Sequence, residues 1–190
     1  QNNRIKTPIK LQILETVFCE MTHIHIGQAW DLHWHNKVGS GQHPIPTFEQ
    51  YLEMVSNKTG VLIRLAVRIT CIILGLDKSI TEKLVNFAEA FGVAFQIQDD
   101  ILNLVSQEYS GTKGFIGEDI HEGKISLIII HCLNNSTESD KKRLLQILSS
   151  HTDDPHVISE AIRILESTNS IKVSEKIGKD MVINAWKNVS

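Results

Sequence analysis

Two adjacent carboxylates lie inside a stretch that otherwise has the composition of a buried helix. At helical spacing, Gln96, Asp99, Asp100 and Asn103 occupy positions i, i+3, i+4 and i+7, so their oxygen donors line one face among Phe, Val, Ala, Ile and Leu side chains. Neighbouring acids beside apolar surface are costly unless a cation compensates their charge. The pattern therefore predicts a cation site. Magnesium fits it because this ion takes carboxylate oxygens and keeps positions for water and phosphates.

A second Asp-Asp pair in the chain serves as an internal control for this argument. Asp153 and Asp154 are also adjacent, but they stand in a polar segment directly before Pro155. Proline favours a turn or the first position of a helix. We expect these two acids to cap a helix and to face solvent. The same interpretation competes at Asp99 and Asp100, where the flanking apolar residues weigh against it.

Three lysines stand where they could complete an anion site. Lys58 precedes Thr59 and Gly60 within an apolar helical segment, and Lys113 and Lys124 bracket the polar segment that follows the acidic stripe. Carboxylates that bind magnesium, opposite several lysines, suit a diphosphate, because the metal and the ammonium groups share its charge. A single lysine is more often a solvated surface residue. The prediction therefore depends on the lysines in combination with Asp99 and Asp100.

A second polar stripe is predicted nearer the N-terminus. Gln28 and Asp31 lie three residues apart, directly after Gly27. Residues at this spacing are neighbours on a helix surface, and glycine allows another backbone or a ligand to approach closely. We expect this stripe to face the stripe that contains Asp99 and Asp100.

The elements that must position these residues are predicted to be helices. Apolar residues recur at three-to-four spacing almost throughout, with only 4 prolines and 11 glycines, so we expect an all-α fold of six to eight helices in one domain over residues 1–190. Long helices are expected over 8–34, over 47–74 with Thr47 as cap and a break signal near Gly60, and over 81–105. Residues 106–124 are expected to form a functional loop.

Composition excludes several classes of protein. A net charge of −3 with interspersed acids and bases does not indicate a surface that binds nucleic acid. No apolar run is long enough to span a bilayer and no secretory signal is visible, so we expect a cytoplasmic chain without stable membrane insertion. The isolated residues Cys19, Cys71 and Cys132 are expected to be buried, reduced thiols.

Taken together, the motifs resemble those of the trans-isoprenyl diphosphate synthases. The Asp-Asp-x-x-Asn stretch at 99–103 resembles the second aspartate-rich motif of this family, in the form typical of geranylgeranyl diphosphate synthases. Further matching segments occur in the family's order: His25-x-Gly27-Gln28-x-x-Asp31-x-x-Trp34, Lys58-Thr59-Gly60, Glu108-Tyr109-Ser110 and Glu118-Asp119-x-x-Glu122-Gly123-Lys124-x-Ser126.

The resemblance implies a helical bundle of the isoprenoid-synthase type around a central apolar cavity, in a homodimer. It implies a magnesium-dependent prenyltransferase that condenses an allylic substrate, farnesyl diphosphate, with isopentenyl diphosphate to give geranylgeranyl diphosphate. By position, the implied metal ligands are Asp99, Asp100 and Asn103. The implied diphosphate-binding residues are Lys58, Thr59, Gln96, Lys113, Lys124 and Gln28. Among them, the implied catalytic residues, which stabilise the leaving diphosphate, are Lys58, Thr59, Gln96 and Lys124.

The chain also departs from the family pattern. It resembles the C-terminal two-thirds, so the first aspartate-rich motif and the residues that bind isopentenyl diphosphate are expected upstream of Gln1. Ile26, Val61 and Ile128 replace a family arginine, a frequent glycine and a usual proline. Two alternatives therefore stay open: a terpene synthase that ionises a prenyl diphosphate to a volatile terpene, and a non-catalytic partner subunit.

Overall fold

The computed structural model describes residues 5–37, 45–105 and 117–189. These ranges contain helices and no strand, so the predicted all-α class is confirmed. The elements are α1 (Thr7–His35), α2 (Phe48–Val55), the π-helical turn η1 (Ser56–Gly60), α3 (Val61–Leu74), α4 (Lys78–Val105), α6 (Glu118–Glu122), α7 (Leu127–Asn135), α8 (Glu138–Ser150), α9 (Pro155–Ser167) and α10 (Ser170–Lys187). The described ranges thus hold nine α-helices, more than the six to eight expected.

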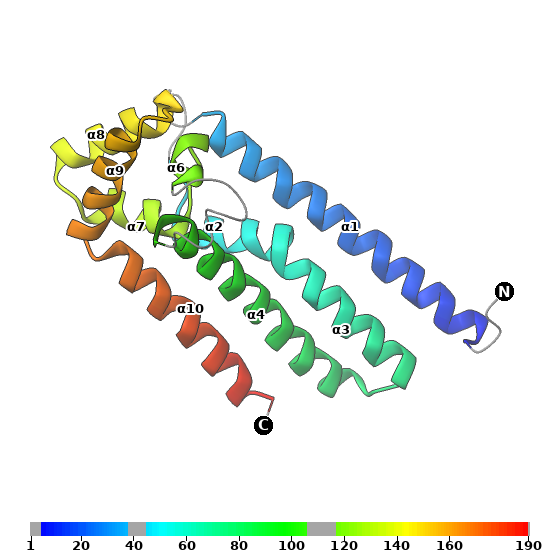
Figure 1. The fold of residues 1–190 in the computed structure, drawn as a ribbon. Helices are drawn as coiled ribbons and strands as arrows, with labels where there is room; N and C mark the ends of the chain where they lie inside the picture. Colours follow the sequence, from blue (N-terminus) through cyan, green and yellow to red (C-terminus); the bar gives the residue numbers. More distant parts are fainter. Residues whose placement is uncertain (1–4, 38–44, 106–116, 190) are drawn as a thin grey trace.

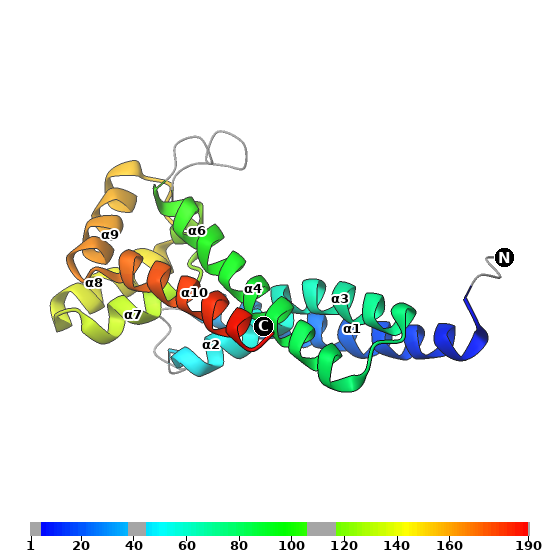
Figure 2. The ribbon, with the colours of Figure 1, turned by 90° about the horizontal axis from the view of Figure 1, so that it is seen from below.

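The four long helices lie side by side in one layer. Helix α3 lies between α1 and α4, and α10 lies along the other side of α4 (Figure 1). The shorter helices α6, α7, α8 and α9 gather at one end of this layer, as the view from below also shows (Figure 2). The candidate site residues of α4 lie toward the same end, because they belong to its last turns.

The second long segment is helical throughout, and its irregularity is a π-helical turn. Thr47 forms the predicted capping box, because its Oγ1 accepts from the N–H of Gln50 at 3.3 Å while the Gln50 Oε1 accepts from the N–H of Thr47 at 2.8 Å. The helix then widens over Ser56–Gly60 and continues as α3. The break signal near Gly60 therefore marks the end of a wide turn within one continuous helix.

Two glycines let the π-helical turn lie against both neighbouring helices. A Cβ atom on Gly27 of α1 would lie 2.6 Å from the backbone nitrogen of Lys58. A Cβ atom on Gly92 of α4 would lie 2.7 Å from the Cα of Gly60. Any larger residue would collide with backbone at these points. The close approach predicted for Gly27 is therefore confirmed, and it fixes η1 between α1 and α4.

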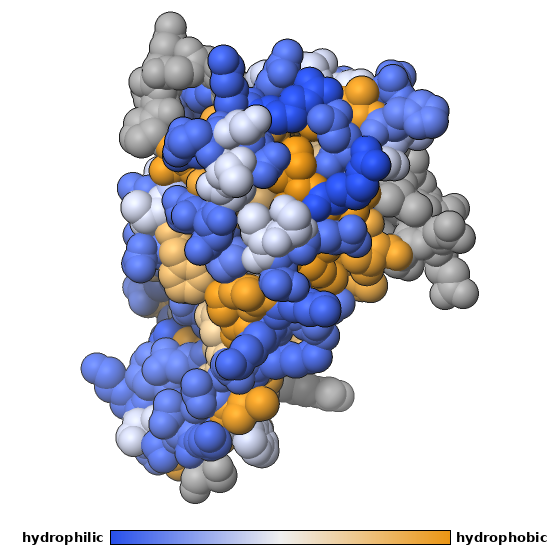
Figure 3. Space-filling model, turned by 90° about the vertical axis from the view of Figure 1, so that its left-hand side faces the viewer, coloured by the Kyte–Doolittle hydropathy of each residue, from blue (hydrophilic) through white to orange (hydrophobic). Residues whose placement is uncertain are grey.

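The hydrophobic core lies where α7, α8 and α9 meet the end of α4. Leu127, Ile128 and Ile130 of α7 are buried there with Leu144 and Leu165. Toward the α8–α9 end, hydrophilic and hydrophobic residues are interspersed on the surface (Figure 3). Among the helices of the described ranges, none combines the length and hydropathy needed to cross a bilayer. The predicted cytoplasmic location stays a prediction.

The three cysteines carry free thiols, as expected, but they are not all buried. Cys71 and Cys132 lie in the interior, whereas Cys19 is exposed on α1. The expectation of burial was wrong for Cys19 because the side of α1 on which it lies is exposed: Ile26, seven residues later on the same side, is 41% exposed.

Candidate active site

The polar stripe on α4 is assembled as the sequence predicts, with Gln96 at its centre. The Nε2 of Gln96 donates to Asp100 Oδ1 at 2.9 Å and to Asp99 Oδ2 at 3.4 Å. Its Oε1 accepts from the hydroxyl of Thr59 at 2.9 Å. Thr59 therefore fixes the orientation of the carboxamide, and the carboxamide holds both acids. The structure thus brings together one residue of η1 and three of α4.

Asp100 is the buried member of the acidic pair, with 2% exposure. Its Oδ2 accepts from the hydroxyl of Tyr51 at 3.1 Å, and its Oδ1 accepts from Lys124 Nζ at 2.8 Å. Burial, followed by the negative charge of Asp100, raises the pKa of Tyr51 well above its ordinary value, so the phenol stays a donor. Sequence reasoning missed Tyr51, because on an amphipathic helix it is indistinguishable from a core aromatic.

Lys124 bridges two carboxylates, since its Nζ also donates to Asp119 Oδ2 at 3.0 Å. Burial alone lowers the pKa of Lys124, but the charges of Asp100 and Asp119 outweigh burial and raise it above its ordinary value. Burial raises the pKa of Asp119 to about 6, against the opposing charge of Lys124. Asp119 was visible in the sequence as part of a family motif, but no role was predicted for it.

The charges of this cluster do not balance within the described residues. Asp100 and Asp119 share the ammonium of Lys124, and the half-buried Asp99 accepts from Gln96 on the same face of α4. A divalent cation would match this excess of carboxylate, so the donor set fits magnesium. No three His, Cys, Asp or Glu side chains of the described ranges are already grouped as metal ligands. The roles of Asp99 and Asp100 in metal binding stay predictions.

Lys58 faces the first helix, where its Nζ forms an ion pair with Asp31 Oδ2. The polar stripe predicted on α1 therefore does lie opposite the site, through Asp31. Gln28 is half-buried on α1 beside Gly27. Within the described part of the chain it makes no hydrogen bond to the other predicted site residues, so its diphosphate role also stays a prediction.

Asn103 anchors the segment that follows α4. Its backbone carbonyl accepts from the N–H of Gly117 at 2.9 Å, and its Oδ1 accepts from the N–H of Asp119 at 3.1 Å. Its predicted metal role is untested. The expected loop ends in a helix, α6, between Gly117 and Gly123, which both have positive φ. Lys113 and the Glu-Tyr-Ser motif at 108–110 lie outside the described residues.

The substitutions noted in the sequence lie in different surroundings. Val61 and Ile128 are fully buried, in α3 and α7. Ile26 is 41% exposed on α1.

An open apolar cavity of about 390 Å³ lies between α4 and α10, with Phe91 and Phe95 in its lining. Because Phe91 and Asp100 are nine residues apart and so lie on opposite sides of the helix, the cavity faces away from Asp100.

Known proteins with similar sequences and structures were compared with this chain. The family model described as polyprenyl synthetase matches residues 3–165. A geranylgeranyl pyrophosphate synthase of Aspergillus fumigatus is 42% identical over 151 residues, which is 80% of this chain and 39% of that protein. One of Penicillium canescens is 42% identical over 153 residues, 80% of this chain and 42% of that protein. The chain thus spans about two fifths of the length of these relatives.

The fold agrees with this match. The crystal structure of geranylgeranyl pyrophosphate synthetase from Pyrococcus horikoshii superposes with a TM-score of 0.84 at 31% identity, over 99% of this chain and 55% of that one. The matched region includes the polar stripe of α4, Lys58 and Lys124. The chain therefore belongs to the polyprenyl synthetase family.

Proposed function

We propose that the natural protein containing this chain is a magnesium-dependent trans-prenyltransferase. In this proposal it condenses farnesyl diphosphate with isopentenyl diphosphate to give geranylgeranyl diphosphate. Membership of the family and the names of the relatives from Aspergillus and Penicillium support it. The observation that carries it is the site itself, where Asp100 and Asp119 share the ammonium of Lys124, and Gln96 joins Asp99 and Asp100 to Thr59.

The residues of this chain bind and orient the leaving group. Lys58 and Lys124 carry the positive charges. One carboxylate fixes the direction of the Lys58 ammonium group, and two carboxylates fix that of Lys124. Thr59 and Gln96 place hydroxyl and amide groups between them. Magnesium, held by Asp99 with Asp100 behind it, would share the diphosphate charge as a Lewis acid. Preorganised charge of this kind stabilises a diphosphate as it departs from an allylic carbon.

The proposal includes a homodimer. Helix α1 exposes Leu11, Leu14 and Phe18, with exposed fractions of 57%, 53% and 68%. A row of exposed apolar side chains on one helix suits an isologous contact between two copies. We expect the natural protein to sediment as a dimer, and Leu14→Glu with Phe18→Glu to sediment as a monomer. An unchanged sedimentation coefficient in the double variant would show that the dimer contact does not involve these side chains of α1.

The reaction is tested by incubating the natural protein with farnesyl diphosphate, labelled isopentenyl diphosphate and Mg²⁺. We expect labelled geranylgeranyl diphosphate that depends on Mg²⁺ and forms with a kcat/KM about 10²- to 10³-fold lower in Lys58→Met. Volatile hydrocarbon formed without isopentenyl diphosphate would instead identify a terpene synthase. Absence of both products would favour a non-catalytic partner subunit.

A further inference from the structure

A buried ionic cluster lies beside the π-helical turn and outside the proposed diphosphate site. Arg64 of α3 is 8% exposed and Glu20 of α1 is 6% exposed. Two hydrogen bonds join them, from Nε to Oε1 at 3.1 Å and from Nη2 to Oε2 at 2.7 Å. Burial alone raises the pKa of Glu20, but its hydrogen bonds to Arg64 and His23 outweigh burial and lower it. The pair is therefore fully ionised at neutral pH.

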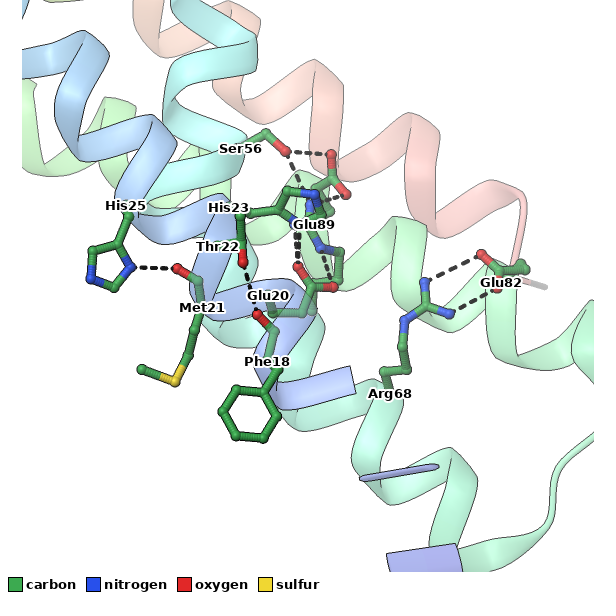
Figure 4. A network of polar contacts seen from close by, with 11 residues as sticks. Phe18, Glu20, Met21, Thr22, His23, His25, Ser56, Arg68, Glu82 and Glu89 are labelled. Carbon is green, nitrogen blue, oxygen red and sulfur yellow. Dashed lines mark hydrogen bonds and ion pairs between the residues drawn. The ribbon is translucent and has the colours of Figure 1, made fainter. Parts of the chain in front are cut away.

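The same arginine reaches a second helix and the first residue of the turn. Arg64 Nη1 donates to Glu89 Oε2 of α4 at 2.7 Å and to Ser56 Oγ at 3.2 Å, while the Ser56 hydroxyl donates to Glu89 Oε1 at 2.6 Å. Glu20, Ser56 and Glu89 converge on this point from three segments (Figure 4). We call Arg64, Glu20, Ser56 and Glu89 the Arg64 cluster. It ties α1, α4 and the start of η1 to one guanidinium group.

Each flanking helix meets η1 with the same order of residues. On α1, the face toward η1 carries Glu20, Gly27 and Asp31, at i, i+7 and i+11. Glu20 binds Arg64, and Asp31 binds Lys58. Gly27, between them, allows the backbone of Lys58 to approach closely.

The corresponding face of α4 carries Glu89, Gly92 and Gln96, at i, i+3 and i+7. Glu89 binds Arg64 and Ser56, Gly92 admits the backbone of Gly60, and Gln96 binds Thr59. A carboxylate of the Arg64 cluster thus lies at one end of each face, and a partner of Lys58 or Thr59 lies at the other.

The direction in which Lys58 and Thr59 point depends on the wide turn. The N–H of Val61 reaches back five residues to the carbonyl of Ser56, which is the π-helical pattern. Loss of the extra residue from this turn would rotate Lys58 and Thr59 by roughly 100° relative to α3. Lys58 would then leave Asp31, and Thr59 would leave Gln96. Isolated π-helical turns are rare, so packing and side-chain contacts must hold this one in place.

We propose that the Arg64 cluster is a positioning device that holds the π-helical turn, and through it directs Lys58 and Thr59 toward the diphosphate. The inference deepens the proposed function and rests on it. Arg64 is buried and its contacts are Glu20, Ser56 and Glu89, so it acts as a positioning residue. A buried ion pair contributes little net stability compared with apolar residues of the same volume. The geometry it imposes on η1 is therefore its main effect.

Two variants weaken the cluster to different extents. Arg64→Lys keeps the charge but loses the two-pronged contact with Glu20. Ser56→Ala removes only the hydroxyl that joins the turn to the cluster, leaving Arg64 with both glutamates, so it carries the test if Arg64→Lys does not fold. Arg68→Lys is the matched control, because Arg68 lies on the same helix as Arg64 and pairs with Glu82 of α4 at 3.0 Å (Figure 4). Among the described residues, no hydrogen bond or ion pair joins Arg68 to η1.

The first readout needs no activity. We expect the backbone amides of residues 57–61 to exchange hydrogen at least about tenfold faster in Arg64→Lys and Ser56→Ala, because the turn opens more often. Arg68→Lys is expected to leave these amides unchanged. Equal exchange in all three variants and the unaltered protein would overturn the inference, whatever reaction the protein performs.

The second readout is kinetic, on the natural protein with farnesyl diphosphate. We expect Arg64→Lys to lower kcat/KM by about 10- to 100-fold, since a displacement near 1 Å has this effect on positioned groups. In a Lys58→Met background the same change should cost at least about threefold less, because one of the two residues that the turn directs is gone. An equal fold-loss in both backgrounds would show that Arg64 acts only on stability and would overturn the inference. No product from the unaltered protein would instead refute the proposed function.

Discussion

The chain contains the dipeptide Asp-Asp twice, in two environments that differ in almost every respect. Asp99 and Asp100 lie on a helix between apolar residues, and Asp100 is buried with Tyr51 and Lys124 as partners. Asp153 and Asp154 are exposed, and Asp154 caps α9 by accepting from the N–H of His156 at 2.8 Å. The expectation that the second pair faces solvent is confirmed for both acids, and the expected helix cap is confirmed for Asp154. The neighbours of an acidic pair, rather than the acids, decide whether it requires a cation.

The largest expected effect comes from removing the cation that the first pair uses. Lys124→Met leaves Asp100 and Asp119 buried without their ammonium partner, so we expect the free energy of unfolding in urea to fall by about 3–5 kcal/mol. Lys179→Met is the control, because Lys179 is 65% exposed and pairs with Glu175 on its own helix. It should change stability by less than about 0.5 kcal/mol. Equal losses of unfolding free energy in the two variants would mean that the ammonium of Lys124 does not stabilise the buried carboxylates.

The catalytic consequence of the comparison is tested by neutralising one acid in each pair. Asp99→Asn removes the half-buried carboxylate proposed to hold magnesium, and we expect kcat/KM of the natural protein to fall by about 10²- to 10³-fold. Asp153→Asn should leave kcat/KM unchanged, because that acid is exposed and lies in the irregular segment before α9. Magnesium-dependent activity that survives in Asp99→Asn would place the metal elsewhere.

Burial also predicts a dependence of stability on pH that exposed acids lack. The pKa of Asp119 rises from 3.8 to about 6 on folding, so the folded protein binds more protons than the unfolded chain between these values. The contribution of Asp119 to the free energy of unfolding is therefore fully present below pH 3.8 and is lost as pH rises to about 6. This change is on the order of 3 kcal/mol. Asp119→Asn should abolish this slope in urea titrations at several pH values, and Asp153→Asn should keep it. A slope that persists in Asp119→Asn would assign it to another group.

The smallest effect is expected at the second pair. Asp154→Ala removes the N-cap of α9 and should cost about 1 kcal/mol of unfolding free energy. Asp153→Ala should stay within about 0.5 kcal/mol. Thermal unfolding of both variants measures this difference. A cost at Asp153 equal to that at Asp154 would show that the pair does more than cap a helix.

Most of the fold was predictable because it depends on local patterns. The spacing of apolar residues gave α1 as 8–34 against an observed Thr7–His35, and the Thr47 capping box formed as expected. Helix α4 begins three residues earlier than expected, because Asp77 Oδ1 accepts from the N–H of Ile80. The number of short helices was underestimated. The π-helical turn was not predictable, since it depends on Gly27 and Gly92 from two other helices.

The site was predictable in its α4 stripe and not in the partners that other elements supply. Gln96, Asp99 and Asp100 follow from spacing on one helix, and Thr59 does meet them. Tyr51 and Arg64 were missed because their roles arise from contacts 49 residues and 44 residues apart in the chain. A tyrosine on an amphipathic helix, or an arginine in an apolar one, carries no local signal of the residue it will meet.

Calorimetric titration with inorganic pyrophosphate tests the central claim most directly, because it asks for binding without catalysis. We expect the natural protein to bind pyrophosphate at least about tenfold more tightly with Mg²⁺ than without it, which corresponds to about 1.4 kcal/mol. Asp99→Asn should lose this gain, and Asp153→Asn should retain it. Affinity that is independent of Mg²⁺, or that falls equally in both variants, would contradict a magnesium-diphosphate site on α4.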